Sequence, residues 1–149
     1  MCAACALQAE GAQSSLGHLA QAFSVEEARA AELETMGPRP NALDGAPVES
    51  KLVLHADRNV EIGIWEVTPG TFPASKDDVG ELMQFISGAG TITDDDGVTE
   101  IEPGVVMYTP DGWTGVWTVR ETVRKTYAVH RTKARWRHGL RVVVRRLGR

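Results

Sequence analysis

The stretches that decide the fold are GTFPASKDDVGELMQFISG at residues 70–88 and GVVMYTPDGWTG at residues 104–115. Both place glycines and prolines at the ends of short runs rich in β-branched and aromatic residues. Glycine permits the positive φ angles of tight turns, and the Pro110-Asp111-Gly112 corner presets the chain for a turn into the next strand. The two stretches therefore predict short strands separated by tight turns.

The same alternation extends in both directions, from about residue 50 to residue 130. Asp96-Gly97 between two alternating segments is typical of a hairpin, and turns are also expected at 68–70, 88–90 and 103–104. The connections are too short for the crossover helices of a parallel sheet. We therefore expect an all-β jelly-roll barrel. Its strands are predicted at 51–55, 60–67, 81–87, 91–93, 98–102, 105–109, 114–119 and 122–129.

The first 44 residues are predicted to form a loose leader with one short helix. Ser24 and Glu27 have the spacing of a capping box, and good helix formers follow from Ala28 to Glu34. The Gly37-Pro38 pair is expected to end this helix before the barrel domain at 45–130.

Composition excludes several classes of protein. With 42% hydrophobic and 24% charged residues the chain is too apolar for a disordered acidic protein. It contains no apolar stretch of the roughly 18–20 residues that span a bilayer. Both cysteines lie in the first five residues, so no disulfide is expected within the barrel. We expect a cytoplasmic protein that does not interact with membranes.

The two ends of the chain are expected to be flexible tails. Residues 131–149 contain eight basic and no acidic residues, against a net charge of −12 for residues 1–130. This charge density could bind nucleic acid, but no nucleic-acid-binding motif accompanies it. We expect a solvated extension, or one lying against the acidic body, rather than a nucleic-acid site. Cys2 and Cys5 have C-x2-C spacing, but two thiolates alone cannot complete a tetrahedral zinc site.

The glycine spacing resembles the two motifs of the cupin superfamily, G-x5-H-x-H-x3-4-E-x6-G and G-x5-P-x-G-x2-H. The matching frames begin at Gly70 and Gly104 and end at Gly88 and Gly115. Segments 63–70, 112–117 and 123–127 are further similar to small cupins grouped with the (S)-ureidoglycine aminohydrolase cupin domain, relatives of the ethanolamine-utilisation cupins. The resemblance covers roughly residues 45–130 and implies a single cupin-type jelly-roll barrel.

The resemblance also implies a metal site of three histidines and one glutamate, and this sequence departs from it. Lys76, Asp78 and Gly115 stand at the three histidine positions, and only Glu81 keeps its residue type. Lysine repels a dication and glycine offers no ligand atom. Asp77 or Asp78 with Glu81 could still hold Mn²⁺ or Mg²⁺, and His55 is a weaker candidate. We therefore expect no metal ligands of the usual kind, and the cofactor stays open.

Strand alternation predicts which other side chains share the interior with Glu81. If Glu81 points inward, so do Met83 and Phe85, while Trp113 and Trp117 share the face of Gly115. An inward Lys125 would need a carboxylate partner, for which Glu81 is the natural candidate. The candidate catalytic residues are therefore Glu81, Lys125 and Tyr127, and the candidate substrate-binding residues are Trp65, Met83, Phe85, Trp113 and Trp117.

Two interpretations of this constellation stay open, a structural ion pair within an aromatic core and a small-molecule pocket. We expect a single-domain cupin that binds a small metabolite in the barrel without the three-histidine metal site. The alternative, implied by the resemblance, is a metal-dependent enzyme of the ureidoglycine-aminohydrolase type acting on a small amine or amide. A homodimer is also expected, because small jelly rolls leave apolar faces and sheet edges to cover.

Overall fold

Two long strands, β5 (Val79–Asp94) and β8 (Thr114–Arg131), organise the fold. The structure is a computed structural model that describes residues 20–132. The two strands pair antiparallel from Val79–Arg131 to Thr93–Val116, and the register shifts near Gly88. There a Cβ atom on Gly88, whose φ is 96°, would lie 2.3 Å from the carbonyl oxygen of Thr122. Glycine thus allows the two backbones to approach closely while both strands bend around the interior.

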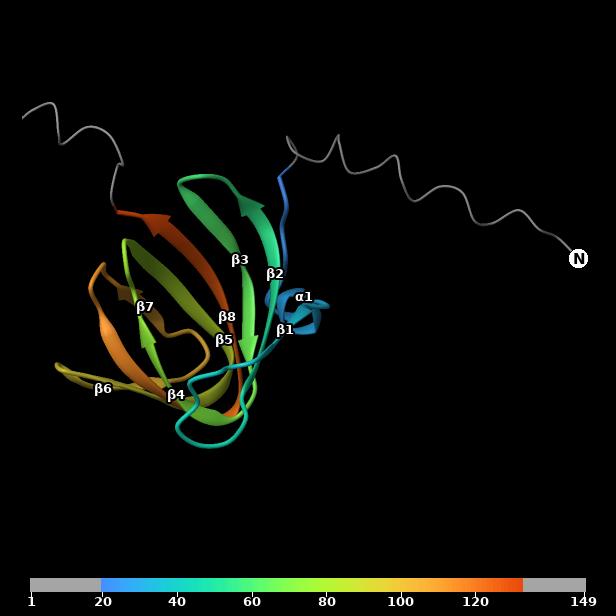
Figure 1. The fold of residues 1–149 in the computed structure, drawn as a ribbon. Coiled ribbons are helices and arrows are strands. Elements are labelled where there is room, and N and C mark those ends of the chain that lie inside the picture. The colour runs from blue at the N-terminus through green and yellow to red at the C-terminus, as the bar shows by residue number, and fades with distance from the viewer. Residues whose placement is uncertain (1–19, 133–149) are drawn as a thin grey trace, which may run out of the picture.

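The remaining strands extend this pair into a curved eight-stranded sheet. β8 also pairs with β4 (Gly70–Ser75) along its first half and with β3 (Val60–Val67) along its second half. The sheet order is β1-β2-β3-β8-β5-β6, with β4 on β8 and β7 on β5. Figure 1 shows β1, β2 and β3 on one side of the barrel and β4, β6 and β7 on the other. The other bounds are β1 (Glu34–Pro38), β2 (Val48–Ala56), β6 (Gly97–Ile101) and β7 (Val106–Thr109).

This architecture confirms the all-β jelly-roll prediction, with corrections to individual elements. The turn expected at 88–90 is wrong, because the strands predicted at 81–87 and 91–93 are parts of the continuous β5. The strands predicted at 114–119 and 122–129 likewise form the single strand β8. Strands β1 and β4 were not expected, since Pro38 and Pro73 lie within them. Both are edge strands, in which proline's missing N–H breaks no central ladder.

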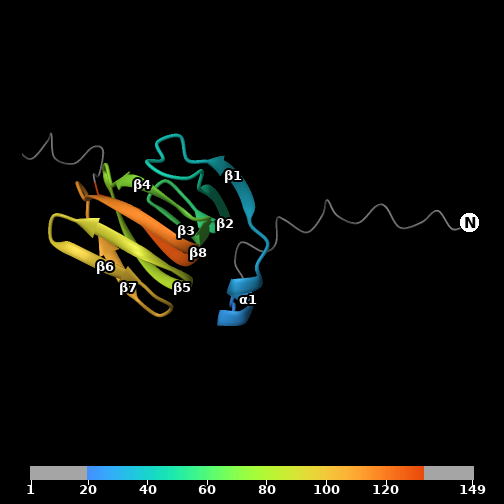
Figure 2. The ribbon, with the colours of Figure 1, turned by 90° about the horizontal axis from the view of Figure 1, so that it is seen from below.

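The predicted capping box is confirmed at the start of helix α1 (Val25–Ala30), which lies outside the barrel (Figure 2). The Ser24 hydroxyl accepts from the Glu27 N–H at 3.1 Å, and the Glu27 carboxylate accepts from the Ser24 N–H at 2.7 Å. The helix ends at Ala30, four residues before the expected end at Glu34. At this end the Arg124 guanidinium donates to the backbone oxygens of Ala28, Arg29 and Ala31, which have no partner further along the helix.

The sheet is apolar on both faces. Inside, Phe72, Phe85, Ile92 and Trp117 belong to the main core, while α1 covers Ile64 and Ile86 on the outside. Beyond α1 the outer face exposes the apolar side chains of Ile62, Leu82, Val106 and Tyr108. The homodimer stays a prediction.

The described region ends just inside the basic tail. Arg131 and Thr132 are described, whereas the remaining tail residues and the Cys2 and Cys5 motif lie outside the described residues. No helix within residues 20–132 is long and apolar enough to cross a membrane.

We predict that Arg124→Ala loosens α1 from the sheet. Arg124 is buried, donates to three backbone oxygens and pairs with Glu66 at 2.7 Å. Hydrogen bonds to a charged group contribute about 1.5–3 kcal/mol, so we expect a comparable loss in the free energy of unfolding and faster amide exchange in α1. The control is Arg120→Ala, since Arg120 makes an exposed pair with Glu100 and should cost under about 1 kcal/mol. Equal losses in both variants, measured by denaturant unfolding, would contradict the prediction.

Candidate functional site

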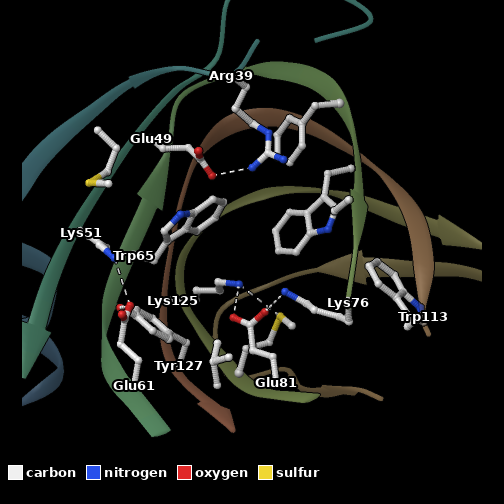
Figure 3. Close-up of a pocket in the computed structure, with 16 residues that line it drawn as sticks. Arg39, Glu49, Lys51, Glu61, Trp65, Lys76, Glu81, Trp113, Lys125 and Tyr127 are labelled. Carbon is white, nitrogen blue, oxygen red and sulfur yellow. Dashed lines mark hydrogen bonds and ion pairs between the residues drawn. The ribbon is translucent and has the colours of Figure 1, made fainter. Parts of the chain in front are cut away.

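A cavity of about 280 Å³ lies inside the barrel (Figure 3). Aromatic rings form much of its wall, from Trp65 on β3, Phe72 on β4, and Trp113 and Trp117 at the start of β8. The rings of Trp65 and Trp117 meet edge to face, with centroids 5.7 Å apart. The volume lies near the lower end of the range for small-molecule pockets.

At the inner end of the cavity, one carboxylate is shared between two lysines. Lys125 Nζ lies 2.6 Å from Glu81 Oε1, and Lys76 Nζ pairs with the other oxygen, Glu81 Oε2. The side chains of Glu81 and Lys125 are only 4% and 6% exposed. Strand alternation explains the placement, because Glu81 on β5 and Lys125 on β8 both occupy inward positions, while the neighbouring Leu82 points outward.

The environment changes the pKa of both members of the buried pair. Burial alone would raise the pKa of Glu81, but the charges of Lys125 and Lys76 outweigh it and hold the pKa below its usual value. Burial lowers the pKa of Lys125; Glu81 opposes this shift, and the like charge of Lys76 adds to it. The result is an ionised carboxylate with one positive charge in excess beside it.

The two indole rings provide further contacts to the buried ammonium. Lys125 Nζ lies 4.6 Å from the Trp65 centroid and 5.0 Å from the Trp117 centroid. It also lies 3.7 Å from the Met83 sulfur. A cation within about 6 Å of an aromatic face is attracted by the ring quadrupole, more strongly where water is excluded. Lys125 Nζ therefore contacts two indole rings, one sulfur and the Glu81 carboxylate, and the residue also lines the cavity.

A second set of charges forms a more exposed rim. Tyr127 donates to Glu61 Oε1 at 2.8 Å, and Lys51 pairs with the same oxygen at 3.1 Å. Arg39 pairs with Glu49 at 2.5 Å and stacks on the Phe72 ring. Figure 3 shows these two pairs around the central Glu81 cluster. Arg39 Nε is buried and makes no hydrogen bond to any described residue.

Tyr127 belongs to the rim rather than to the inner cluster. Burial and its hydrogen bond to Glu61 raise the pKa of Tyr127 above its usual value. The phenol is therefore neutral at physiological pH and acts as a donor. Its structural role is to hold Glu61 and to fill the space above Gly63, where a Cβ atom would lie 3.0 Å from the phenol oxygen.

The structure brings most of the predicted site residues to one cavity. Phe85 differs: it is fully buried behind Trp117, with ring centroids 5.8 Å apart, and does not line the cavity among the described residues. The predicted residues that do line it are Glu81, Lys125, Tyr127, Trp65, Met83, Trp113 and Trp117.

Sequence reasoning missed the other charged residues of the cavity. Lys76 was considered only as an unsuitable metal ligand, although the turn between β4 and β5 places it opposite Glu81. Arg39 follows β1, and the glycine and proline in β1 are untypical of a strand. The local sequence therefore does not indicate that Arg39 belongs to the site. The residues missed are Lys76, Arg39, Glu49, Lys51 and Glu61.

The residues present do not fit the metal implied by the cupin motifs. Asp77, Asp78 and His55 are exposed, and none of them lines the cavity among the described residues. Lys76 occupies one oxygen of Glu81, and the Trp113 ring lies 2.4 Å from where a Gly115 Cβ atom would stand. Residues 20–132 hold no group of three or more His, Cys, Asp or Glu side chains suited to a metal.

Comparisons with known proteins agree with this architecture. The family model of the EutQ-like cupin domain matches residues 54–127. No curated protein matches the chain.

Several solved structures share the fold. A Pseudomonas syringae protein of unknown function is 26% identical with a TM-score of 0.61, over 68% of this chain and 45% of that one. The Clostridium difficile EutQ protein is 20% identical with a TM-score of 0.51, over 60% of this chain and 71% of that one. A predicted oxalate decarboxylase from Thermotoga maritima is 12% identical with a TM-score of 0.53, over 67% of this chain and 94% of that one.

We predict that Glu81→Gln destabilises the protein more than Lys125→Met does. The glutamine variant leaves the buried ammonium of Lys125 and the partly buried ammonium of Lys76 without a counter-ion, whereas the methionine variant leaves Glu81 paired with Lys76. Removing one partner of a buried pair costs about 3–5 kcal/mol, and we expect Glu81→Gln to fall in that range. Combining both substitutions should recover part of the loss. The measurement is the free energy of unfolding in denaturant.

The rim pair provides the matched control. Lys51→Met removes a lysine that is 29% exposed and should cost under about 1 kcal/mol.

The stability of the wild type should also depend on pH through Glu81, whose pKa is lowered in the folded state. Its contribution to the free energy of unfolding is present above the unfolded pKa of about 4.3 and is lost as the pH falls through the folded pKa. Glu81→Gln should flatten this acid dependence. An unchanged acid dependence, or equal stability of all variants, would contradict the prediction.

Proposed function

We propose that the barrel of this chain, of which residues 54–127 match the EutQ-like cupin domain, binds a small organic anion. The single observation behind the proposal is the Glu81 carboxylate shared by Lys76 and Lys125 at the inner end of an aromatic cavity. One carboxylate neutralises only one of the two ammonium groups. An incoming carboxylate or similar anion would balance the second.

The charge of the whole cavity supports the same conclusion. Its described lining holds four cations and three carboxylates, which leaves an excess of one positive charge. This excess is local, because residues 1–130 together carry a net charge of −12. Electrostatic attraction is strongest where low-dielectric walls exclude water, as the indole rings do here.

The aromatic walls define the rest of the ligand. Trp65, Trp113 and Trp117 offer flat apolar surfaces, and the edge of the cavity carries the paired charges of the rim. Binding sites of small molecules combine such walls with a few convergent polar groups. We infer a compact ligand with one anionic end and an apolar or planar body, bound without the three-histidine metal site.

A second candidate is an enzyme of the ureidoglycine-aminohydrolase type. It is favoured by the Glu81–Lys125 hydrogen bond, which faces the cavity and could move a proton to a leaving amine. Ammonia release from ureido and amino compounds, with and without added Mn²⁺, tests this activity. Ammonia release by the wild type that is lost in Glu81→Gln supports this enzymatic activity. Absence of ammonia release from every compound tested counts against it.

We predict that benzoate quenches the tryptophan fluorescence of the wild type and raises its Tm, since three indole rings line the cavity. Ala74→Phe places a ring in the cavity and should abolish both effects. The control Val98→Phe adds the same ring at an exposed site on β6 and should bind normally.

Neutral and cationic analogues make the test specific for the anion. Benzamide and benzylamine match benzoate in size, and each should bind at least tenfold more weakly, about 1.4 kcal/mol. Equal binding of all three compounds would refute the anion preference. Binding that survives Ala74→Phe would show that the ligand lies elsewhere.

A further inference from the structure

Lys125 has an environment that favours a reactive amine. Its Nζ is buried against two indole rings and the Met83 sulfur, and it faces the cavity. A second cation, Lys76, lies on the same carboxylate. Desolvation and a neighbouring positive charge both favour the neutral form of an amine, which is the nucleophilic form. The direction of the Lys125 pKa, below its usual value, is consistent with this geometry.

Glu81 is placed to take and return protons. Its Oε1 atom lies 2.6 Å from Lys125 Nζ, and its other oxygen stays paired with Lys76. The carboxylate can therefore accept a proton from the amine without losing its contact with the second lysine. No other described carboxylate lies within hydrogen-bond distance of Lys125 Nζ.

We propose that Lys125 forms an imine with the carbonyl group of a bound 2-oxo carboxylic acid. The inference rests on the proposed function, since the carboxylate of this compound is the anion that Lys76 would hold. A 2-oxo acid places its carbonyl carbon next to its carboxylate. The two lysines meet at one glutamate, so an anion on Lys76 brings that carbon toward Lys125.

The step balances without a further reactant. Lys125 gives one proton to Glu81, and its nitrogen bonds to the carbonyl carbon as the carbonyl electron pair moves to oxygen. Glu81 returns the proton to this oxygen and takes a second proton from the nitrogen. That second proton converts the hydroxyl to water, which leaves as the nitrogen electron pair forms the C=N bond. An ammonium and a carbonyl group thus become an iminium and water.

The experiment traps the imine by reduction. The wild-type protein is incubated with pyruvate and sodium cyanoborohydride at neutral pH, and peptide mass spectrometry locates the carboxyethyl group. The chain has only four lysines, Lys51, Lys76, Lys125 and Lys133, so each can be scored separately. We expect Lys125 to be labelled at least about tenfold faster than Lys51.

Two variants distinguish chemistry at Lys125 from incidental labelling. Lys125→Arg keeps a positive charge beside Glu81 but has no nucleophilic amine at this pH, so the adduct should be lost, and a cooperative thermal unfolding transition confirms that the variant is folded. Lys76→Gln should slow labelling of Lys125 by pyruvate more than labelling by acetaldehyde, which has no carboxylate. Lys51 lines the same cavity at its rim and is the internal control.

Labelling of Lys125 no faster than of Lys51, or a total rate of pyruvate labelling that is undiminished in Lys125→Arg, would overturn the imine proposal. This failure is distinguishable from failure of the proposed function. If benzoate still quenches the tryptophan fluorescence while pyruvate leaves Lys125 unlabelled, the anion site stands and the imine does not. If benzoate fails to bind as well, the anion site itself is wrong.

Discussion

The interaction on which the site depends is the pairing of one buried carboxylate with two lysines. Charges inside an apolar barrel are tolerated only when they are paired, and here Glu81 is the common partner. The antiparallel register of β5 and β8 sets this arrangement. Met83 stands opposite Tyr127, and Lys125 leans past Met83 to reach Glu81. The two long strands that build the barrel thus also place its charges.

The same cluster accounts for a glutamate inside the barrel without a metal ion. A carboxylate inside a barrel needs a cation, and Lys76 and Lys125 provide it from the protein itself. At Gly115 the missing side chain leaves room for the Trp113 ring, whose N–H donates to Asp94 at 2.8 Å. Lys76 and Gly115, which align with histidine positions of the cupin motifs, thus belong to an aromatic cavity that carries its own cations.

The sequence could predict those parts of the site that lie on regular strands. Glu81, Met83 and Lys125 follow from alternation along segments whose β character is evident, and the need to pair a buried lysine suggested its partner. The rim could not be predicted. Arg39 directly follows the edge strand β1, which contains a glycine and a proline, and its contact with Glu49 requires the β1–β2 pairing. Such contacts depend on the folded barrel and leave no local pattern in the sequence.

Arg124 and Lys125 show why burial of a cation does not by itself indicate a functional site. The two residues are consecutive on β8 and are both buried, on opposite faces of the sheet. Arg124 donates hydrogen bonds to Glu66 and to the backbone oxygens at the end of α1, so its guanidinium holds the helix against the sheet. Lys125 shares its single carboxylate with Lys76 and faces a cavity. What distinguishes Lys125 is its shared carboxylate next to an accessible space, and the proposed ligand site rests on that difference rather than on burial alone.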